Sequence, residues 1–391
     1  MSMHNDHMAY QDGMEDIGSE ILERVVAEGA AYNSDAFSPE DVRTALEKER
    51  LGIRDFAALL SPAAESFLQP MAERAKDETA RYFGNGVRLF TPLYIANYCV
   101  NHCTYCGFSC KNKILRGKLT LDEISREFEA IAATGLDEIL LLTGESRKMS
   151  DTDYIGEAVK IAAQYFGAVG VEIYPLNTGE YARLRELGAD FVSVYQETYI
   201  PEIYDRVHPA GPKRSYPYRF NAQERAIRGG MRGVSFGALF GLGEFCRDAY
   251  SAGLHAYFLQ KKYPHAEVSF SAPRIRLHSS DPLYFEKESG QGGTERVSER
   301  KLLQALSAYR IFMPFAGITI SSRERAGFRD NVAGMCATRI SAGVSVGVGG
   351  HESEMKGGEQ FEIADARSVD EIYSMLRGRG LQPVYTDYIR V

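Results

Sequence analysis

Long apolar runs are missing from this sequence of 391 residues, and its first 16 residues are polar. A membrane-spanning helix needs about 20 mostly apolar residues, and a secretory signal needs an apolar core of roughly 7–15 residues. The sequence offers neither, so we expect no membrane contact and a cytoplasmic location.

Basic residues are in the minority, with 45 Lys and Arg against 53 Asp and Glu and a formal net charge of -8. Proteins that bind nucleic acids neutralise phosphates with clustered Lys and Arg, and no such run is present. We therefore expect no nucleic-acid partner. Hydrophobic residues make up 44% of the chain and charged residues 25%, proportions typical of a globular enzyme with a sizeable core.

Cysteine is scarce as well, with six residues in the whole chain. That number is too small for a disulfide scaffold. Three of the six, Cys99, Cys103 and Cys106, nevertheless fall within eight positions, and Cys110 follows closely. Such crowding in a cytosolic chain indicates metal or catalytic chemistry rather than cross-linking.

Short apolar runs alternate with helical patterns from residue 93 to residue 342. Strands separated by helices pair in parallel through right-handed crossovers. About eight such units favour a closed (β/α)8 TIM-type barrel of the α/β class over an open sheet. The expected strands are 93–97, 138–143, 170–175, 191–195, 233–238, 267–271, 317–321 and 338–342.

Helical patterns fill the intervals and both ends of the chain. We expect an N-terminal helical extension at 1–84, the barrel at 85–342, and a tail at 343–391 that closes over the substrate. Ser38-Pro39 is typical of a helix start, with serine as the cap and proline in the first turn. The expected helices include 15–31, 121–133, 153–166, 178–187, 201–207, 222–229, 246–262, 298–313 and 323–335.

The three clustered cysteines follow the first barrel strand directly, in the string CVNHCTYC. Three thiolates can bind one face of a cubane iron–sulfur cluster and leave its fourth iron open to a small molecule. The carboxyl ends of barrel strands are also where active sites form. The alternative is a zinc site completed by His102 or Cys110, although zinc sites favour two separated pairs of ligands.

The spacing CX3CX2C, with Tyr105 before the last cysteine, resembles the signature of the radical S-adenosylmethionine superfamily. The resemblance implies a [4Fe–4S] cluster on Cys99, Cys103 and Cys106. It also implies that S-adenosylmethionine binds the open iron through its amine and carboxylate, with Tyr105 against the adenine.

Polar residues at other strand ends provide candidate contacts for that cofactor. By the same resemblance, Gly144 and Glu145 after the second strand meet the methionyl amine. Glu172 and Glu197 place carboxylates at the same mouth, where an unpaired acid is costly to bury, and a ribose diol suits Glu197. Arg219 resembles an arginine that biotin synthase relatives direct at the cofactor carboxylate. The alternatives are a simple turn at Gly144 and a helix-start salt bridge for Arg219.

Longer strings, among them LYIANYCVNHCTYCGF, VYQETYIPEIYDRVHPAGPK and GLQPVYTDY, resemble the tyrosine lyases over about residues 85–390. The resemblance is to the 2-iminoacetate synthases of thiazole (thiamine) biosynthesis. It implies that a 5′-deoxyadenosyl radical takes a hydrogen atom from the tyrosine amino group. The Cα–Cβ bond then breaks to give 2-iminoacetate and p-cresol. Implied partners are L-tyrosine, a reductant such as flavodoxin or ferredoxin, and thiazole synthase.

Arginines near the last strands suit the carboxylate of an amino-acid substrate. Arg274 and Arg276 alternate along the sixth predicted strand and so point to one face. Arg323 can bind a carboxylate through two parallel hydrogen bonds, Ser321 can orient the amine, and Glu324 can neutralise nearby charge. We expect Arg323 and Ser321 to hold the tyrosine backbone. The alternative is an ion pair between arginine and glutamate at the rim of the barrel.

Other functions predict other residues. A hydrogenase-maturation tyrosine lyase needs cysteines for a second cluster, and none follows Cys336. A tryptophan lyase would differ in its aromatic substrate, and a biotin synthase-type enzyme would need further barrel cysteines. A non-catalytic iron–sulfur electron carrier would not need arginines and acids at the strand ends. The chain departs from the tyrosine lyase pattern at Ser322, usually threonine, and at His351, often tyrosine.

Overall fold

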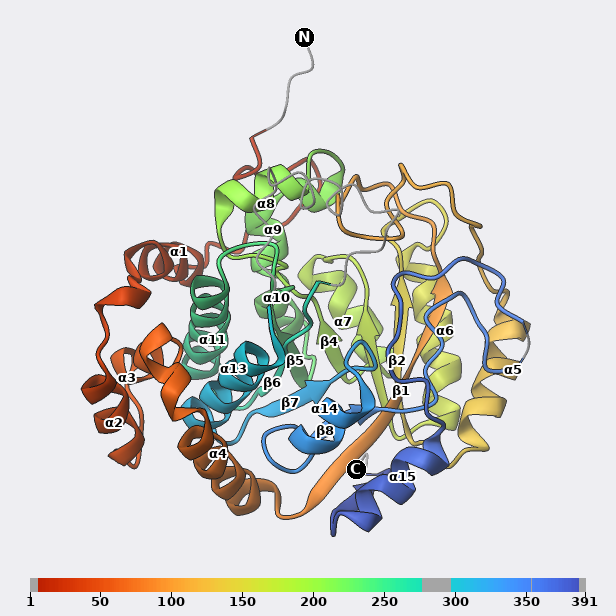
Figure 1. Ribbon diagram of the computed structural model, residues 1–391. Coiled ribbons are helices and arrows are strands. Elements are labelled where there is room, and N and C mark those ends of the chain that lie inside the picture. Colours follow the sequence, from red (N-terminus) through yellow and green to blue (C-terminus); the bar gives the residue numbers. More distant parts are fainter. Residues whose placement is uncertain (1–5, 276–296, 353, 387–391) are drawn as a thin grey trace.

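Eight parallel strands close into a barrel in this computed structural model, which describes residues 6–275, 297–352 and 354–386. The strands pair in chain order from β2 to β8, and β1 closes the ring by pairing with both β8 and β2. Helices connect successive strands (Figure 1), so the predicted (β/α)8 TIM-type barrel is confirmed. The strands are β1 Gly86–Ala96, β2 Glu138–Thr143, β3 Ala168–Glu172, β4 Phe191–Ser193, β5 Gly233–Phe236, β6 Glu267–Ser271, β7 Gly317–Ile320 and β8 Arg339–Ser341.

Helices cover the outside of the barrel, and most begin and end close to the predicted bounds. The helix predicted at 323–335 is shorter, because Arg323 and Glu324 lie in the loop between β7 and α14. The helices are α5 Leu121–Ala132, α6 Thr152–Tyr165, α7 Thr178–Glu186, α8 Pro201–Val207, α9 Tyr216–Phe220, α10 Ala222–Arg228, α11 Phe245–Lys262, α13 Glu299–Phe312 and α14 Ala326–Val332.

The N-terminal helices lie along one side of the barrel, where α1 packs on α11 and α4 packs on α13 (Figure 1). Ser38 caps α2 by accepting a hydrogen bond from the Asp41 amide, as its sequence predicted. The helix predicted at 15–31 begins only at Ile21, because Gly18 adopts a left-handed conformation with φ of 58°. These helices are α1 Ile21–Ala31, α2 Pro39–Glu47, α3 Ile53–Leu59 and α4 Leu68–Phe83.

The C-terminal segment returns to the first strand. After β8 the chain runs across the barrel mouth to α15 Val369–Gly378 and the short strand β9 Gln382–Val384. Strand β9 pairs in parallel with the first residues of β1, which the sequence prediction did not include in a strand. The start of β1 thus lies between β8 and β9.

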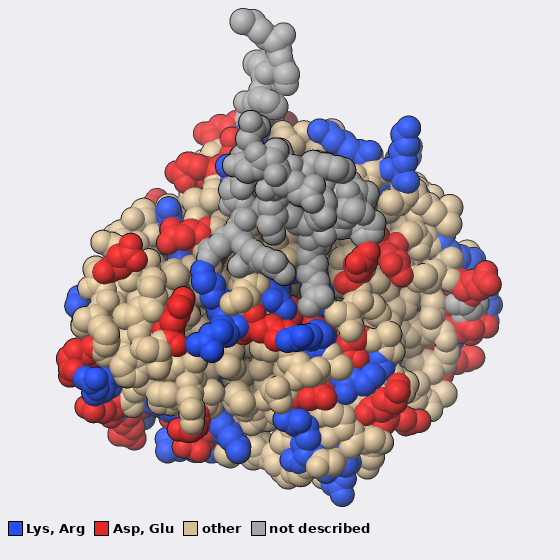
Figure 2. Space-filling view, in the orientation of Figure 1, with Lys and Arg blue, Asp and Glu red and all other residues tan. Residues whose placement is uncertain are grey.

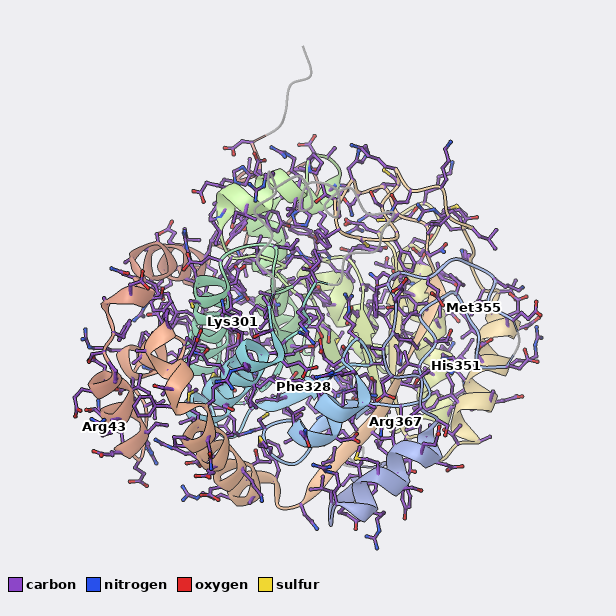
Figure 3. The ribbon with its side chains drawn as sticks, in the orientation of Figure 1. Arg43, Lys301, Phe328, His351, Met355 and Arg367 are labelled. Atoms are coloured by element: carbon purple, nitrogen blue, oxygen red, sulfur yellow. The ribbon has the colours of Figure 1, made fainter. Side chains whose placement is uncertain are left out.

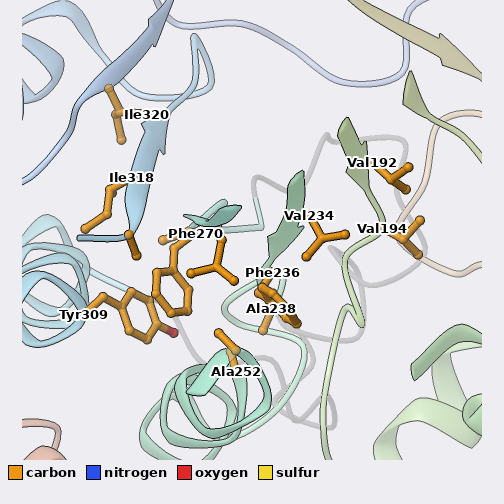
Figure 4. Close-up of a cluster of buried hydrophobic side chains, with 14 of the residues drawn as sticks. Val192, Val194, Val234, Phe236, Ala238, Ala252, Phe270, Tyr309, Ile318 and Ile320 are labelled. Atoms are coloured by element: carbon orange, nitrogen blue, oxygen red, sulfur yellow. The ribbon is translucent and has the colours of Figure 1, made fainter. Parts of the chain in front are cut away.

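The largest apolar core lies between the barrel and its helices. Figure 4 shows part of it, where valine, isoleucine and phenylalanine side chains of β4 to β7 meet Tyr309 of α13. The rings of Phe270 and Tyr309 stack with their centroids 4.3 Å apart. Burial of this apolar surface is the main favourable contribution to folding.

A second, smaller apolar cluster fills the barrel interior, with Phe90, Leu140 and Phe191 among its members. These side chains alternate along their strands with residues of the outer core, so they point to the opposite face. The guanidinium of Arg339 lies 4.9 Å from the Phe90 ring centroid and 4.7 Å from that of Phe191. The interior is therefore packed rather than open at this level.

Phe191 fits inside the barrel because its neighbour on β3 is Gly170. A β-carbon at Gly170 would overlap the Phe191 ring. We expect Gly170→Ala to lower the free energy of unfolding by about 1–3 kcal/mol, measured by denaturant titration. Gly179→Ala is the matched control, because no atom lies within 4 Å of that position, and it should change stability little. Equal stability of the two variants would contradict this packing.

Among the described residues, no helix is long and apolar enough to cross a membrane. On the face shown in Figure 2, acidic and basic side chains are interspersed rather than segregated by sign.

Candidate active site

A structured loop after β1 carries the cysteines at the mouth of the barrel. Asn97, the first residue of this loop, accepts a hydrogen bond from the Gly117 amide (2.8 Å) and donates one to the Leu115 carbonyl (2.9 Å). The Arg116 guanidinium donates to the Asn97 carbonyl (2.7 Å) and the Phe108 carbonyl (2.9 Å). The two ends of the loop are thereby tied together around the cysteines.

The three predicted ligands lie together, and none forms a disulfide. Cys103 is buried, while Cys99 and Cys106 are partly exposed. Burial raises the pKa of the Cys99 and Cys103 thiols. Cys106 raises the pKa of Cys99 further, and for Cys103 the nearby Lys213 opposes the rise while Cys99 and Cys106 add to it. Cys110 is exposed, and its amide donates to the Asn101 carbonyl. Thiols that oppose each other's ionisation in this way need a cationic partner to become thiolates.

This donor set fits the cubane cluster. Among the described residues, no three His, Cys, Asp or Glu side chains are placed to hold a single metal ion. A cubane presents a separate iron to each thiolate, so its ligands need not converge on one point. With three thiols in the set, Cys99, Cys103 and Cys106 would bind three irons and leave the fourth to another ligand.

Gly144 and Glu145 lie directly against the cysteine loop. A β-carbon at Gly144 would overlap the Tyr98 carbonyl oxygen and lie 3.2 Å from the β-carbon of Cys99. The glycine therefore lets the loop approach β2, which is a structural reason for it that the sequence did not reveal. The Asn101 side chain donates to the Glu145 carboxylate (2.5 Å), whose pKa is nevertheless raised by burial.

Glu197 forms the centre of a charged group. It has a φ of 73°, which side-chain-bearing residues rarely adopt. Its carboxylate accepts hydrogen bonds from Lys213 Nζ (2.7 Å) and Arg219 Nη2 (3.2 Å). Burial raises the pKa of Glu197, but Lys213 and Arg219 outweigh burial and hold the pKa below its usual range. Arg219 therefore makes a salt bridge with Glu197, itself a predicted cofactor residue, and its contact with the cofactor carboxylate stays a prediction.

Tyr105 is fixed by a neutral histidine. Its hydroxyl lies 2.8 Å from His208 Nε2. His208 Nδ1 lies 2.9 Å from the Tyr204 carbonyl, which can only accept, so Nδ1 carries the proton and Nε2 accepts from Tyr105. Burial lowers the pKa of His208 well below its usual value and keeps the ring neutral. The Tyr105 ring is thus held beside Cys103 and Cys106.

Glu172 and Arg323 present opposite charges inside the barrel mouth. Burial raises the pKa of Glu172 to about 7, Arg323 opposes that rise and Glu197 adds to it. The Arg323 guanidinium lies 3.4 Å from the centroid of the Phe361 ring. A site that offers one cation and one carboxylate in this way is complementary to the zwitterionic part of an amino acid.

Arg274 does not occupy the predicted position. Strand β6 ends at Ser271, and Arg274 lies beyond it, in an isolated bridge to Phe240. Its guanidinium binds both carboxylate oxygens of Glu324, at 2.9 and 2.5 Å. The prediction that Arg274 alternates along the sixth strand was therefore wrong. The rim ion pair considered for this region exists, but between Arg274 and Glu324 rather than with Arg323.

The remaining predicted contacts are placed differently. Arg276 lies outside the described residues. The Ser321 hydroxyl accepts a hydrogen bond from the Arg323 amide (3.4 Å), so these two residues of the loop after β7 are neighbours. Ser322, where relatives often have threonine, is buried, and its amide donates to Ser341 Oγ (3.2 Å).

Several described residues of the site were not among the predicted ones, including His208 beside Tyr105. Asn101 and Lys213 join the cysteine loop to the Glu197 group, because Asn101 also accepts a hydrogen bond from the Lys213 amide (2.9 Å). Gln360 and Phe361 come from the C-terminal segment and contact Cys106 and Arg323. Lys213 belongs to the string HPAGPK, which the resemblance included, whereas no sequence signal marks Gln360.

Comparison with known proteins agrees with this geometry. The family model described as the Radical SAM superfamily matches residues 93–248, and the Biotin and Thiamin Synthesis associated domain matches residues 271–382. The 2-iminoacetate synthase of Salmonella typhimurium is 37% identical over 352 residues, covering 89% of this chain and 90% of that protein. The 2-iminoacetate synthase of Escherichia coli matches to the same extent.

Solved structures resemble the chain in fold. The crystal structure of the FeFe-hydrogenase maturase HydG from Carboxydothermus hydrogenoformans has a TM-score of 0.83 and 29% identity, over 94% of this chain and 84% of that one. Methylornithine synthase (PylB), with a TM-score of 0.69 and 23% identity, shares the fold. A parallel β/α barrel with three free thiols at its mouth and a matching superfamily model defines a radical S-adenosylmethionine enzyme. Within that class, the chain belongs to the 2-iminoacetate synthase family.

Proposed function

We propose that this chain cleaves the Cα–Cβ bond of L-tyrosine to 2-iminoacetate and p-cresol, for the thiazole part of thiamine. The observation that carries this proposal is the gathering of three free thiols at the mouth of the barrel, in a chain 37% identical to 2-iminoacetate synthases over nine tenths of their length. The opposite charges of Glu172 and Arg323 at the same mouth support an amino-acid substrate.

Cys99, Cys103 and Cys106 would hold the [4Fe–4S] cluster, and the residues around them would hold S-adenosylmethionine. When bound, the cluster would supply the one electron that cleaves S-adenosylmethionine into methionine and a 5′-deoxyadenosyl radical. The protein's part is to bind, orient and shield. We assign the adenine to Tyr105, the methionyl amine to Gly144 and Glu145, and the ribose to Glu197. We propose that Arg219, besides neutralising Glu197, contacts the cofactor carboxylate.

The substrate contacts follow from charge. We propose that Arg323 binds the tyrosine carboxylate and that Ser321 positions Arg323 and the substrate amine. Glu172, which we predicted from the sequence as a cofactor contact, is proposed instead to face the substrate amino group, because Arg323 acts on its carboxyl group. Arg274 and Glu324 hold each other at the rim and thereby keep the loop after β7 in place. The remaining partners that we propose are flavodoxin or ferredoxin as reductant and thiazole synthase as the acceptor of 2-iminoacetate, in the cytoplasm.

The pKa of Glu172 leads to a pH-dependent prediction. A carboxyl group with a pKa of about 7 is about nine-tenths protonated at pH 6 and nine-tenths ionised at pH 8. Because the ionised form attracts the substrate ammonium group, we expect the KM for tyrosine to fall up to about tenfold between those pH values. In Glu172→Gln the KM should be higher and nearly flat with pH. A wild-type KM that does not change over this range would contradict the role of Glu172.

The test of the proposed function is a product assay. The reconstituted full chain is incubated without oxygen with L-tyrosine, S-adenosylmethionine and dithionite. We expect p-cresol and 5′-deoxyadenosine to form together, with little of either when tyrosine is replaced by tryptophan. Formation of 5′-deoxyadenosine without p-cresol, or of an indole product from tryptophan, would overturn the substrate assignment.

A further inference from the structure

The C-terminal segment, residues 344–352 and 354–363, lies directly on the cysteine loop. The Gly358 amide donates to the Leu115 carbonyl (2.8 Å), and the Gly107 amide donates to the Gln360 carbonyl (3.2 Å). A β-carbon at Gly107 would overlap the Gln360 carbonyl oxygen. Gly107 directly follows Cys106, and a larger residue there would overlap the Gln360 backbone, which comes from a distant part of the chain.

The same segment is anchored away from the site by one buried carboxylate. Glu127 of α5 accepts hydrogen bonds from the amides of Gly350 (3.3 Å), His351 (2.8 Å) and Glu352 (3.3 Å). Nε2 of His351, the residue labelled in Figure 3, lies 3.1 Å from the Pro92 carbonyl oxygen. His351 thus fixes the segment to β1 and leaves residues near 360 in a defined position.

Gln360 places its side-chain amide between Cys106 and a buried tyrosine. Its Nε2 lies 3.8 Å from Cys106 Sγ, and its Oε1 accepts a hydrogen bond from the Tyr94 hydroxyl (2.7 Å). A thiolate can only accept, so the amide must turn its NH2 group to Cys106 and its oxygen to Tyr94. The Tyr94 hydroxyl, which can donate or accept, then donates to the amide oxygen and holds the amide in that orientation.

We propose that Gln360 is a positioning residue of the cluster, donating an N–H···S hydrogen bond to the Cys106 thiolate and raising the reduction potential of the cluster. The inference rests on the proposed function, since it requires a cluster on these cysteines. Hydrogen bonds to cluster sulfurs tune reduction potentials, because the reduced cluster carries one more negative charge and gains more from a nearby donor. The C-terminal segment then contributes to the electron transfer that starts the reaction, besides covering the site.

The experiment is a redox titration of the reconstituted full chain, followed by the [4Fe–4S] signal in electron paramagnetic resonance. In Gln360→Leu, we expect a roughly threefold to tenfold lower ratio of reduced to oxidised cluster at a fixed potential. A tenfold change corresponds to a shift of about 59 mV for one electron. Gln360→Glu keeps an acceptor for Tyr94 but loses the N–H donor and adds negative charge. Its reduction potential should therefore be at least as negative as that of Gln360→Leu.

Gln69→Leu is the control, because Gln69 is exposed on α4 and donates a hydrogen bond to Glu73 (3.0 Å), away from the cysteines. The reduction potential of this variant should equal that of the wild type. Gln360→Glu keeps the test valid if the leucine variant fails to fold. An unchanged potential in either Gln360 variant would overturn the inference while leaving the proposed function intact. A wild-type chain that binds no cluster would instead overturn the proposed function.

Discussion

Cys103→Ser is expected to lose the cluster and, with it, all cleavage of S-adenosylmethionine and tyrosine. Cys103 is the buried member of the three ligands, so no other described thiol can replace it at that position. The hydroxyl that remains is a poor cluster ligand, and burying it costs about 1–3 kcal/mol, which a chain of this size should tolerate. Iron content, the absorbance of the cluster and production of 5′-deoxyadenosine are the measurements, with circular dichroism as the check on folding.

Cys110→Ser is the matched control for this prediction. Cys110 lies only four positions after Cys106, yet its side chain is exposed and it contacts the loop through its backbone amide. We expect this variant to keep its iron and its activity. If Cys110→Ser also lost the cluster, or if Cys103→Ser kept it, the ligand set would have to be reassigned.

Arg323→Ala is expected to raise the KM for tyrosine about tenfold to a hundredfold and to change kcat less. The range corresponds to losing charged hydrogen bonds worth about 1.5–3 kcal/mol. The KM of Arg323→Lys should lie between those of the wild type and Arg323→Ala. Lysine keeps the positive charge but lacks the planar guanidinium that binds both oxygens of a carboxylate. Steady-state kinetics with varied tyrosine is the measurement, and the KM for S-adenosylmethionine should stay close to that of the wild type.

Arg325→Ala provides the control two positions away. The Arg325 side chain is 70% exposed and binds Glu299 at the outer rim, so its loss should leave the KM for tyrosine unchanged. Equal effects of the two substitutions would indicate that the whole loop after β7 had been disturbed. An unchanged KM in Arg323→Ala would reject Arg323 as the carboxylate ligand.

The sequence was most informative where neighbouring residues decide the structure. Strands β2 and β6 begin and end at their predicted residues, since β2 contains a run of apolar residues and β6 alternates polar and apolar residues. The first residues of β1 were missed because their strand conformation depends on pairing with β8 and β9, whose residues come about 250 and almost 300 positions later. The start of α1 was missed because the apolar spacing does not show that Gly18 is left-handed.

In the active site, too, features set by neighbouring residues were predicted and features set by distant residues were not. The cysteines and Tyr105 form one short motif, so the spacing alone predicted where they lie. Which arginine forms an ion pair was not predictable, because Arg274 and Glu324 are 50 positions apart and meet only when the barrel closes. Gln360 is further still from Cys106, and a lone glutamine in a polar segment gives no signal in the sequence.

The open iron is the central claim, and adding S-adenosylmethionine to the reduced protein tests it most directly. Reconstituted chain is reduced with dithionite, and its electron paramagnetic resonance spectrum is recorded before and after the addition. We predict a [4Fe–4S] signal whose g values change, because a new ligand binds the iron that Cys99, Cys103 and Cys106 leave free. A spectrum that the addition leaves unaltered, or a protein that holds zinc and no iron after reconstitution, would contradict the account.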